Sequence, residues 1–194
     1  MLIAFNKPFG VICQFSPSGD KPTLKQYLST AGVYPAGRLD TDSEGLLLLT
    51  DDGILQARIA DPRHKMVKTY LVQVEGIPTD SQLEILRQGV DLGDFVALPA
   101  MVKRLAAAPD LWERVPPVRI RREIPTCWLE ISISEGKNRQ VRRMTAKDGF
   151  PTLRLVRTSI GPIHLGTLAP GKWRQIDPAL LPGPNASRQK TPAK

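Results

Sequence analysis

Residues 37–50 of the chain read GRLDTDSEGLLLLT, a polar, charged half followed by a short apolar run. The run at 46–50 is too short and too apolar for an exposed helix, and the DDG that follows at 51–53 suits a tight turn. We therefore predict a buried strand closed by that turn. The charged half is then fixed to the edge of a hydrophobic core, where a carboxylate can be held rigidly. The alternative is a solvated acidic loop, which is the commoner fate of charged loops.

The charge of the chain favours a polyanionic partner. Its 194 residues contain 27 Lys and Arg against 19 Asp and Glu, a formal net charge of +8. Basic side chains that neutralise phosphates release condensed counterions, so this excess favours nucleic acid without identifying it. The length is enough for one fair-sized core or two small ones, at roughly 150 residues per domain.

Cysteine and histidine are too sparse for a disulfide framework or a zinc site. Cys13 and Cys127 each stand alone in an apolar setting, and His64 and His164 are far apart in sequence, so free thiols in a reducing compartment are expected. The apolar runs stay well short of the roughly 18 residues that span a bilayer. The opening MLIAFNKP has neither a basic leader nor a small-residue cleavage site. We expect a cytoplasmic protein that does not enter membranes.

Apolar periodicity predicts more strands than helices. Strands are predicted at 2–5, 11–15, 46–50, 68–75, 96–105 (weakened by Pro99), 128–134, 153–158 and 172–176, and helices at 24–31, 54–59, 79–90 and 139–147. Because the helices fall between strands without strict alternation, the expected class is α+β with a mixed, mainly antiparallel sheet. The proline-rich stretch 106–125 is expected to be a long exposed loop, and 182–194 a disordered basic tail.

Three segments resemble the motifs of one enzyme family. The stretch at 37–50 is similar to the signature segment of the RNA pseudouridine synthases, in the branch that modifies ribosomal RNA. KTYLV at 68–72 resembles the tyrosine motif of that family, and EGKNRQVRRM at 135–144 resembles its basic motif, in the same order and at similar spacing. The opening FNKPFGV at 5–11 most resembles compact members that act on large-subunit (23S) ribosomal RNA.

The resemblance implies a fold, a reaction and a partner. The fold is expected to be a mixed sheet with flanking helices and a central catalytic cleft, formed by residues 1–181 without the small N-terminal RNA-binding domain of many relatives. The reaction is expected to isomerise a specific uridine to pseudouridine in large-subunit ribosomal RNA, and we expect a monomer. It breaks the glycosidic bond, rotates the uracil and joins its C5 to the ribose. Because no electron or outside group is transferred, neither a cofactor nor a metal ion is expected.

This chemistry needs one ionised carboxylate beside the ribose, either to attack C1′ or to remove a sugar proton, and a uridine extruded from its helix. By motif match the catalytic residue is Asp40, with Asp42 and Glu44 as alternatives or as groups of the cleft edge. Arg38 is expected near the extruded base or the gap that it leaves; the alternative is a salt bridge to Asp42 or Glu44. Tyr70 is expected to stack on the uracil and to share in proton removal; the alternative is a core tyrosine with its hydroxyl at the sheet rim.

The basic motif is predicted to start a helix, with Gly136 allowing a sharp turn and Asn138 as the cap. Cations crowded at a helix N-terminus need a negative partner. By resemblance, Arg142 pairs with Asp40 and lowers its pKa, and Val141 lies against the uracil. The remaining cations of the motif are predicted to contact RNA phosphates: Lys137, Arg139 and Arg143. A solvated basic face is the alternative for any one of them.

Other interpretations remain open at this point. The basic residues Arg114 and 119–122, within the proline-rich stretch, fit an RNA clamp and a solvated loop equally well. A non-catalytic RNA-binding or ribosome-assembly protein on the same fold is the main alternative to an enzyme. A carboxylate-based hydrolase is a third, but it usually needs a second acid to protonate the leaving group, a part that Asp42 could nominally take.

Overall fold

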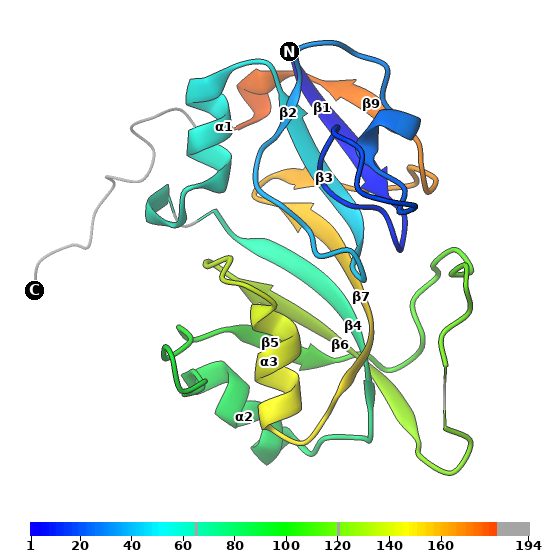
Figure 1. The fold of residues 1–194 in the computed structure, drawn as a ribbon. Helices are drawn as coiled ribbons and strands as arrows, with labels where there is room; N and C mark the ends of the chain where they lie inside the picture. The colour runs from blue at the N-terminus through cyan, green and yellow to red at the C-terminus, as the bar shows by residue number, and fades with distance from the viewer. Residues whose placement is uncertain (65, 120, 182–194) are drawn as a thin grey trace, which may run out of the picture.

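The computed structural model describes residues 1–64, 66–119 and 121–181, and within them one curved sheet runs the length of the molecule (Figure 1). Its strands are β1 (Leu2–Lys7), β2 (Tyr34–Pro35), β3 (Glu44–Thr50), β4 (Lys68–Glu75), β5 (Met101–Arg104), β6 (Thr126–Ile133), β7 (Thr152–Ile160), β8 (Ile163–His164) and β9 (Trp173–Ile176). The order is β5-β6-β4-β7-β3-β1-β9, with β2 on β3 and β8 on β7. All strand pairs are antiparallel except β3 with β7, which confirms the predicted mixed, mainly antiparallel sheet.

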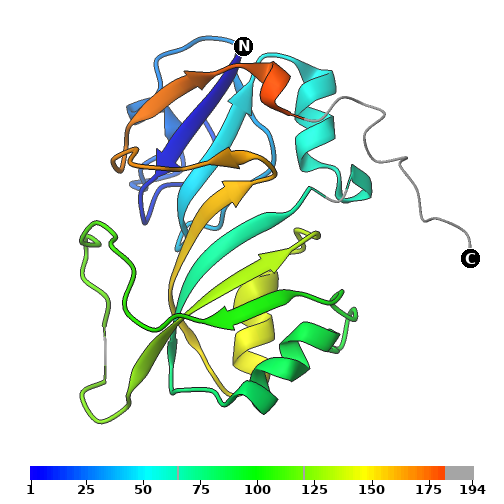
Figure 2. The same cartoon turned by 180° about the vertical axis from the view of Figure 1, so that it is seen from behind.

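Within the described ranges, three α-helices cover the sheet in separate places. They are α1 (Gly53–Ala60), α2 (Asp80–Gln88) and α3 (Gln140–Lys147), and short 3-10 turns occur at Leu24–Gln26, Pro62–His64 and Pro178–Leu180. Figures 1 and 2 show α1 beside β3 in one half, and α2 and α3 together beside β4–β6 in the other. None of the helices in the described ranges is long and apolar enough to cross a membrane.

The leucine run forms the middle of the core. All seven residues of β3 are buried, and its side chains alternate between two faces. Leu46 and Leu48 pack with α1, whereas Leu47 and Leu49 pack with Phe5 and other side chains on the opposite face. A strand covered on both faces reads as a continuous apolar run instead of an alternating one. The predicted strand at 46–50 is therefore confirmed, extended by two residues.

The two halves of the sheet meet at a short parallel contact. In this contact Gly45 of β3 lies opposite Arg157 of β7. Gly45 has a φ of 99°, and a Cβ at this position would lie 2.3 Å from the backbone oxygen of Arg157. A side chain is therefore excluded here on both counts. This close approach fixes the beginning of β3, next to the acidic residues of the segment 37–50.

Several predicted elements are wrong or shortened. The predicted strand 11–15 is a loop in which Ile12 forms a bridge to Thr23, and the predicted helix 24–31 contracts to a 3-10 turn. The apolar side chains of both segments still fill the core, but they reach it from loop positions. The predicted strand 96–105 shortens to β5, since Pro99 cannot donate a ladder hydrogen bond.

The stretch 106–125 contains no helix or strand in its described parts, as expected for a loop. The predicted tail 182–194 lies outside the described residues.

Candidate active site

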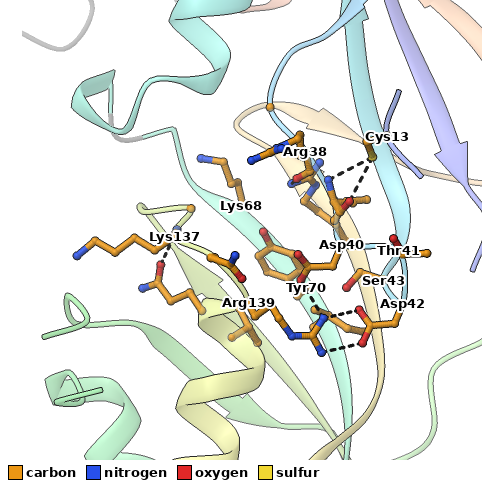
Figure 3. A pocket seen from close by; sticks show the side chains of 18 of the residues that line it. Cys13, Arg38, Asp40, Thr41, Asp42, Ser43, Lys68, Tyr70, Lys137 and Arg139 are labelled. Atoms are coloured by element: carbon orange, nitrogen blue, oxygen red, sulfur yellow. Dashed lines mark hydrogen bonds and ion pairs between the residues drawn. The ribbon is translucent and has the colours of Figure 1, made fainter. Parts of the chain in front are cut away.

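A cavity of about 710 Å³ opens between the two halves of the sheet, and all three sequence motifs line it (Figure 3). Its walls include residues 36–43, Lys68 and Tyr70 of β4, and residues 136–141 at the start of α3. The volume is in the range of small-ligand sites. Of the predicted site residues the cavity brings together Arg38, Asp40, Tyr70, Lys137, Arg139 and Val141, and it leaves Arg142 and Arg143 outside its lining.

The backbone around Asp40 is fixed by hydrogen bonds that come from several directions. The amide of Ser43 donates to the carbonyl oxygen of Asp40 at 3.0 Å, which closes a tight turn, and Gly10 donates to Thr41 O at 2.8 Å. The thiol of Cys13 lies 3.3 Å from Leu39 O, and Leu39 N donates back to the sulfur at 3.4 Å. The Asp40 carboxylate is thus carried on a backbone that the N-terminal loop holds in place.

Lys7 contacts this segment and is fully buried. Its Nζ donates to Pro8 O and Val11 O, both at 2.8 Å, and to Thr41 O at 3.4 Å. Burial lowers its pKa to about 8, against the attraction of Cys13 and of the nearby carboxylates. The amine therefore joins the N-terminal loop to the turn after Asp40.

Arg139 carries the contact between the basic and the acidic motif. Its Nη1 and Nη2 donate to the two carboxylate oxygens of Asp42 at 3.0 and 2.8 Å, and its Nη1 lies 3.9 Å from Asp40 Oδ2. Burial acts to raise the pKa of Asp42, but the hydrogen bonds from Arg139 and the charge of Arg142 outweigh it and lower that pKa. Asp42 is thus an ionised partner for the arginines beside Asp40.

The helix start differs from the prediction. The residue that caps α3 is Arg139, with a left-handed φ of 49°, and not Asn138. The side chain of this cap residue makes no capping hydrogen bond to the first turn of the helix. A non-glycine residue at positive φ is uncommon and is often found at functional sites. This conformation turns the Arg139 side chain toward the acidic segment (Figure 3).

The predicted contact between Arg142 and Asp40 is wrong, because the structure pairs Arg142 with Asp42. Its Nη2 donates to Asp42 O at 2.7 Å, its Nε lies 3.5 Å from Asp42 Oδ2, and its Nη1 donates to Thr152 O at 3.4 Å. Arg139, the left-handed residue, lies at the cavity wall, whereas Arg142, three residues on, does not line the cavity. Arg142 therefore holds the acidic segment through the backbone and the carboxylate of Asp42.

The other two cations of the basic motif are placed differently from each other. Arg143 pairs with Asp94 and donates to Leu92 O at 2.9 Å, so its guanidinium lies away from the cavity. Lys137 lines the cavity, with its Nζ 3.8 Å from the centre of the Phe95 ring. Lys137 is therefore the better placed of the two to meet a ligand.

Tyr70 is a core residue that also borders the cavity. It is 6 % exposed and belongs to the core under β4, and its ring also forms part of the cavity wall. Arg38 is exposed at the cavity rim. Among the described residues Arg38 has no ion pair with Asp42 or Glu44. Asp42 is paired with an arginine of the basic motif, and Glu44 is buried and bound by Arg154.

Sequence reasoning missed two cations of the cavity wall, Lys68 and Arg157. Lys68 precedes Tyr70 by two residues and so shares its face of β4, which a period-two pattern could have shown. Burial, and next the charge of Arg157, lower the pKa of Lys68 to about 8. Arg157 comes from β7, and the sequence holds no signal that would place it here.

Comparison with known proteins identifies the family of this chain. A family profile described as RNA pseudouridylate synthase matches residues 1–147. A protein of Xanthomonas campestris named ribosomal large subunit pseudouridine synthase E is 58 % identical over 179 residues, covering 91 % of this chain and 96 % of that one. A protein of the same name from Vibrio parahaemolyticus is 57 % identical over 175 residues, covering 90 % and 73 %. A solved structure described as a pseudouridylate synthase is 30 % identical with a TM-score of 0.73, covering 92 % and 70 %. On these grounds the chain belongs to the RNA pseudouridylate synthase family.

Proposed function

We propose that the protein isomerises a specific uridine to pseudouridine in large-subunit ribosomal RNA. The observation that carries the proposal is the placement of Asp40 in one cavity with Tyr70 and Arg139, residues that come from three separate motifs. The names of the relatives, which are ribosomal large subunit pseudouridine synthases, supply the substrate class. A working monomer in the cytoplasm, without cofactor or metal ion, stays a prediction.

Three of the cavity residues have a direct part in the proposed reaction. Asp40 acts on the ribose, either by attacking C1′ or by removing a sugar proton, while the N1–C1′ bond breaks. The freed uracil rotates against the ring of Tyr70 and the side chain of Val141, and its C5 then bonds to C1′. The proton on C5 is lost, and N1 gains one. The net result is an isomer of the original nucleotide, so atoms and electrons balance within the RNA.

The arginines of the site have different proposed roles, which follow from their positions. Arg139 places a positive charge 3.9 Å from Asp40 Oδ2, at the wall of the cavity. Arg142 is a positioning residue, because its hydrogen bond at 2.7 Å goes to the backbone of Asp42. Arg38 and Lys137, at the rim, are suited to the RNA strand that enters the cavity, and Arg143 is the least accessible of the predicted phosphate contacts.

Replacing Asp40 by asparagine tests the proposal. RNA carrying tritium at C5 of uridine releases that label when C5 bonds to C1′, so release counts turnovers. We expect Asp40→Asn to bind ribosomal RNA as the wild type does and to release label at background rate. Asp20→Asn, at an exposed aspartate, serves as the control and should release label normally. Appreciable release by Asp40→Asn would remove Asp40 from catalysis, and RNA binding without release by the wild type would favour the non-catalytic alternative.

A further inference from the structure

A buried ion pair anchors the proline-rich stretch 106–125, named here the arm, to the sheet. Arg154 Nε donates to Glu44 Oε2 at 2.9 Å, and the carboxylate is 1 % exposed. The indole Nε1 of Trp112 donates to Glu44 Oε1 at 2.9 Å, and Arg154 Nη2 donates to Trp112 O at the same distance. A residue of the arm thus completes the hydrogen bonding of a buried charge, which is costly to leave unpaired.

This anchor is attached to the catalytic segment itself. Glu44 is the first residue of β3 and follows Asp40 by four positions, so one strand end fixes both. In Figures 1 and 2 the arm, in green, extends beside the lower half of the sheet and reaches toward the N-terminal loops of the other half. Its position is therefore set relative to Asp40.

A second contact holds the arm at the rim of the cavity. The guanidinium of Arg114 lies over the ring of Phe9, 4.3 Å from its centre, and Phe9 lines the cavity. Arg114 also donates to Pro116 O and Pro117 O, each at 2.8 Å. A loop without regular structure is thereby given a defined course past the cavity mouth.

Beyond these contacts the described part of the arm presents two arginines without ion pairs, within a stretch that also contains the exposed carboxylates Asp110, Glu113 and Glu123. Between 114 and 122 the chain has arginines and no acidic residue. Arg119 and Arg122 are exposed, and neither has an ion pair with a carboxylate among the described residues, whereas Arg121 lies 3.7 Å from Glu75. Guanidinium groups bind phosphate through paired N–H donors and are weakly hydrated, so they suit an RNA backbone.

We propose that the arm is an RNA-binding element, in which Arg119 and Arg122 contact phosphates of the strand that leaves the cavity. The inference rests on the proposed function, since a uridine in the cavity belongs to a chain that must continue past the rim. The arm and the start of α3 both border the turn around Asp42, one through Glu44 and the other through Arg139. RNA held by both is held on two sides of the reacting nucleotide.

Photocrosslinking and the salt dependence of binding test the arm. A benzophenone amino acid at Val115, which is 83 % exposed, should crosslink to a large-subunit ribosomal RNA transcript. The same group at Ile54, 81 % exposed on α1, should not. Arg119→Gln and Arg122→Gln should each reduce the slope of log K against log salt by about 0.7 to 0.9. Lys147→Gln, at the far end of α3, is the matched control and should leave the slope unchanged.

The outcomes separate this inference from the proposed function. If Val115 gives no crosslink and both arginine variants have wild-type slopes, while the wild type still forms pseudouridine, the inference that the arm binds RNA is rejected and the proposed function is kept. If the wild-type protein forms no pseudouridine but crosslinks to RNA through Val115, the proposed enzymatic function is rejected and RNA binding by the arm is kept. Equal crosslinking from Ile54 would mean that contact is nonspecific, and it would also reject the inference.

Discussion

Arg139 binds Asp42 through two parallel hydrogen bonds of 3.0 and 2.8 Å, and this pair places its positive charge 3.9 Å from Asp40. A paired guanidinium fork is more sharply oriented than a single contact. Asp42 therefore acts as the holder of the cation, which leaves the carboxylate of Asp40 free to meet a ligand. The arrangement joins two segments that are about a hundred residues apart in the chain.

Removing this fork should change how stability depends on pH. In the folded protein Arg139 and Arg142 lower the pKa of Asp42, so the pair contributes stability above the pKa of the unfolded chain, about 3.9. That contribution is lost as pH falls through the lower folded pKa. We expect Arg139→Gln to be less stable than the wild type at pH 7, with a difference that shrinks toward pH 3. Urea unfolding across this range measures it, and a constant difference would show that the ion pair is not its source.

Arg142 and Arg143 are adjacent, yet they should respond to mutation in different ways. Arg142→Gln leaves the partly buried carbonyl of Asp42 without its donor, a loss of about 1–3 kcal/mol, and should slow turnover at saturating RNA. Arg143→Gln breaks an exposed pair with Asp94, worth about 0–1 kcal/mol, and should keep turnover and salt slope near wild type. Single-turnover rates and binding titrations compare the two. A flatter slope for Arg143→Gln would restore its predicted role as a phosphate contact.

Much of the fold could be predicted because local pattern and burial agree in it. The alternation at 68–75 and the run at 46–50 each specify a strand, and both are found. The segments 11–15 and 24–31 were misassigned, since an apolar side chain that fills the core from a loop looks the same in sequence as one from a strand or helix. Apolar content fixes burial, but the backbone hydrogen bonds decide the element.

The sequence predicted most of the residues that line the site, but fewer of the contacts between their side chains. Three motifs were expected to meet, and six of the eight named residues line one cavity. The sequence could not show that Arg139, and not Arg142, is the arginine near Asp40, because this depends on the left-handed backbone at Arg139. Nor does the sequence indicate that Trp112 reaches Glu44 across 68 positions.

Lys7 should make the protein more stable as pH rises above 8. Its folded pKa of about 8 lies below its ordinary 10.5, so the unfolded chain binds more protons between these values and stability increases with pH there. The full effect is about 3 kcal/mol at 1.36 kcal/mol per pH unit. Lys7→Met removes the titrating group, and its stability should rise less between pH 8 and 10.5. Because Lys68 titrates similarly in both proteins, the difference between their unfolding curves isolates Lys7.

The last prediction concerns the buried pair of Glu44 and Arg154. Glu44→Gln leaves a guanidinium that is almost fully buried without its counter-charge, which typically costs about 3–5 kcal/mol. Replacing both partners by apolar residues of similar volume, Glu44→Leu with Arg154→Met, should recover a large part of this loss, because neither charge is then desolvated. The exposed pair of Lys103 and Glu130 provides the control, and Glu130→Gln should cost no more than about 1 kcal/mol. Thermal and urea unfolding measure all of these variants. If the double variant is as unstable as Glu44→Gln, the unpaired charge is not the source of the loss.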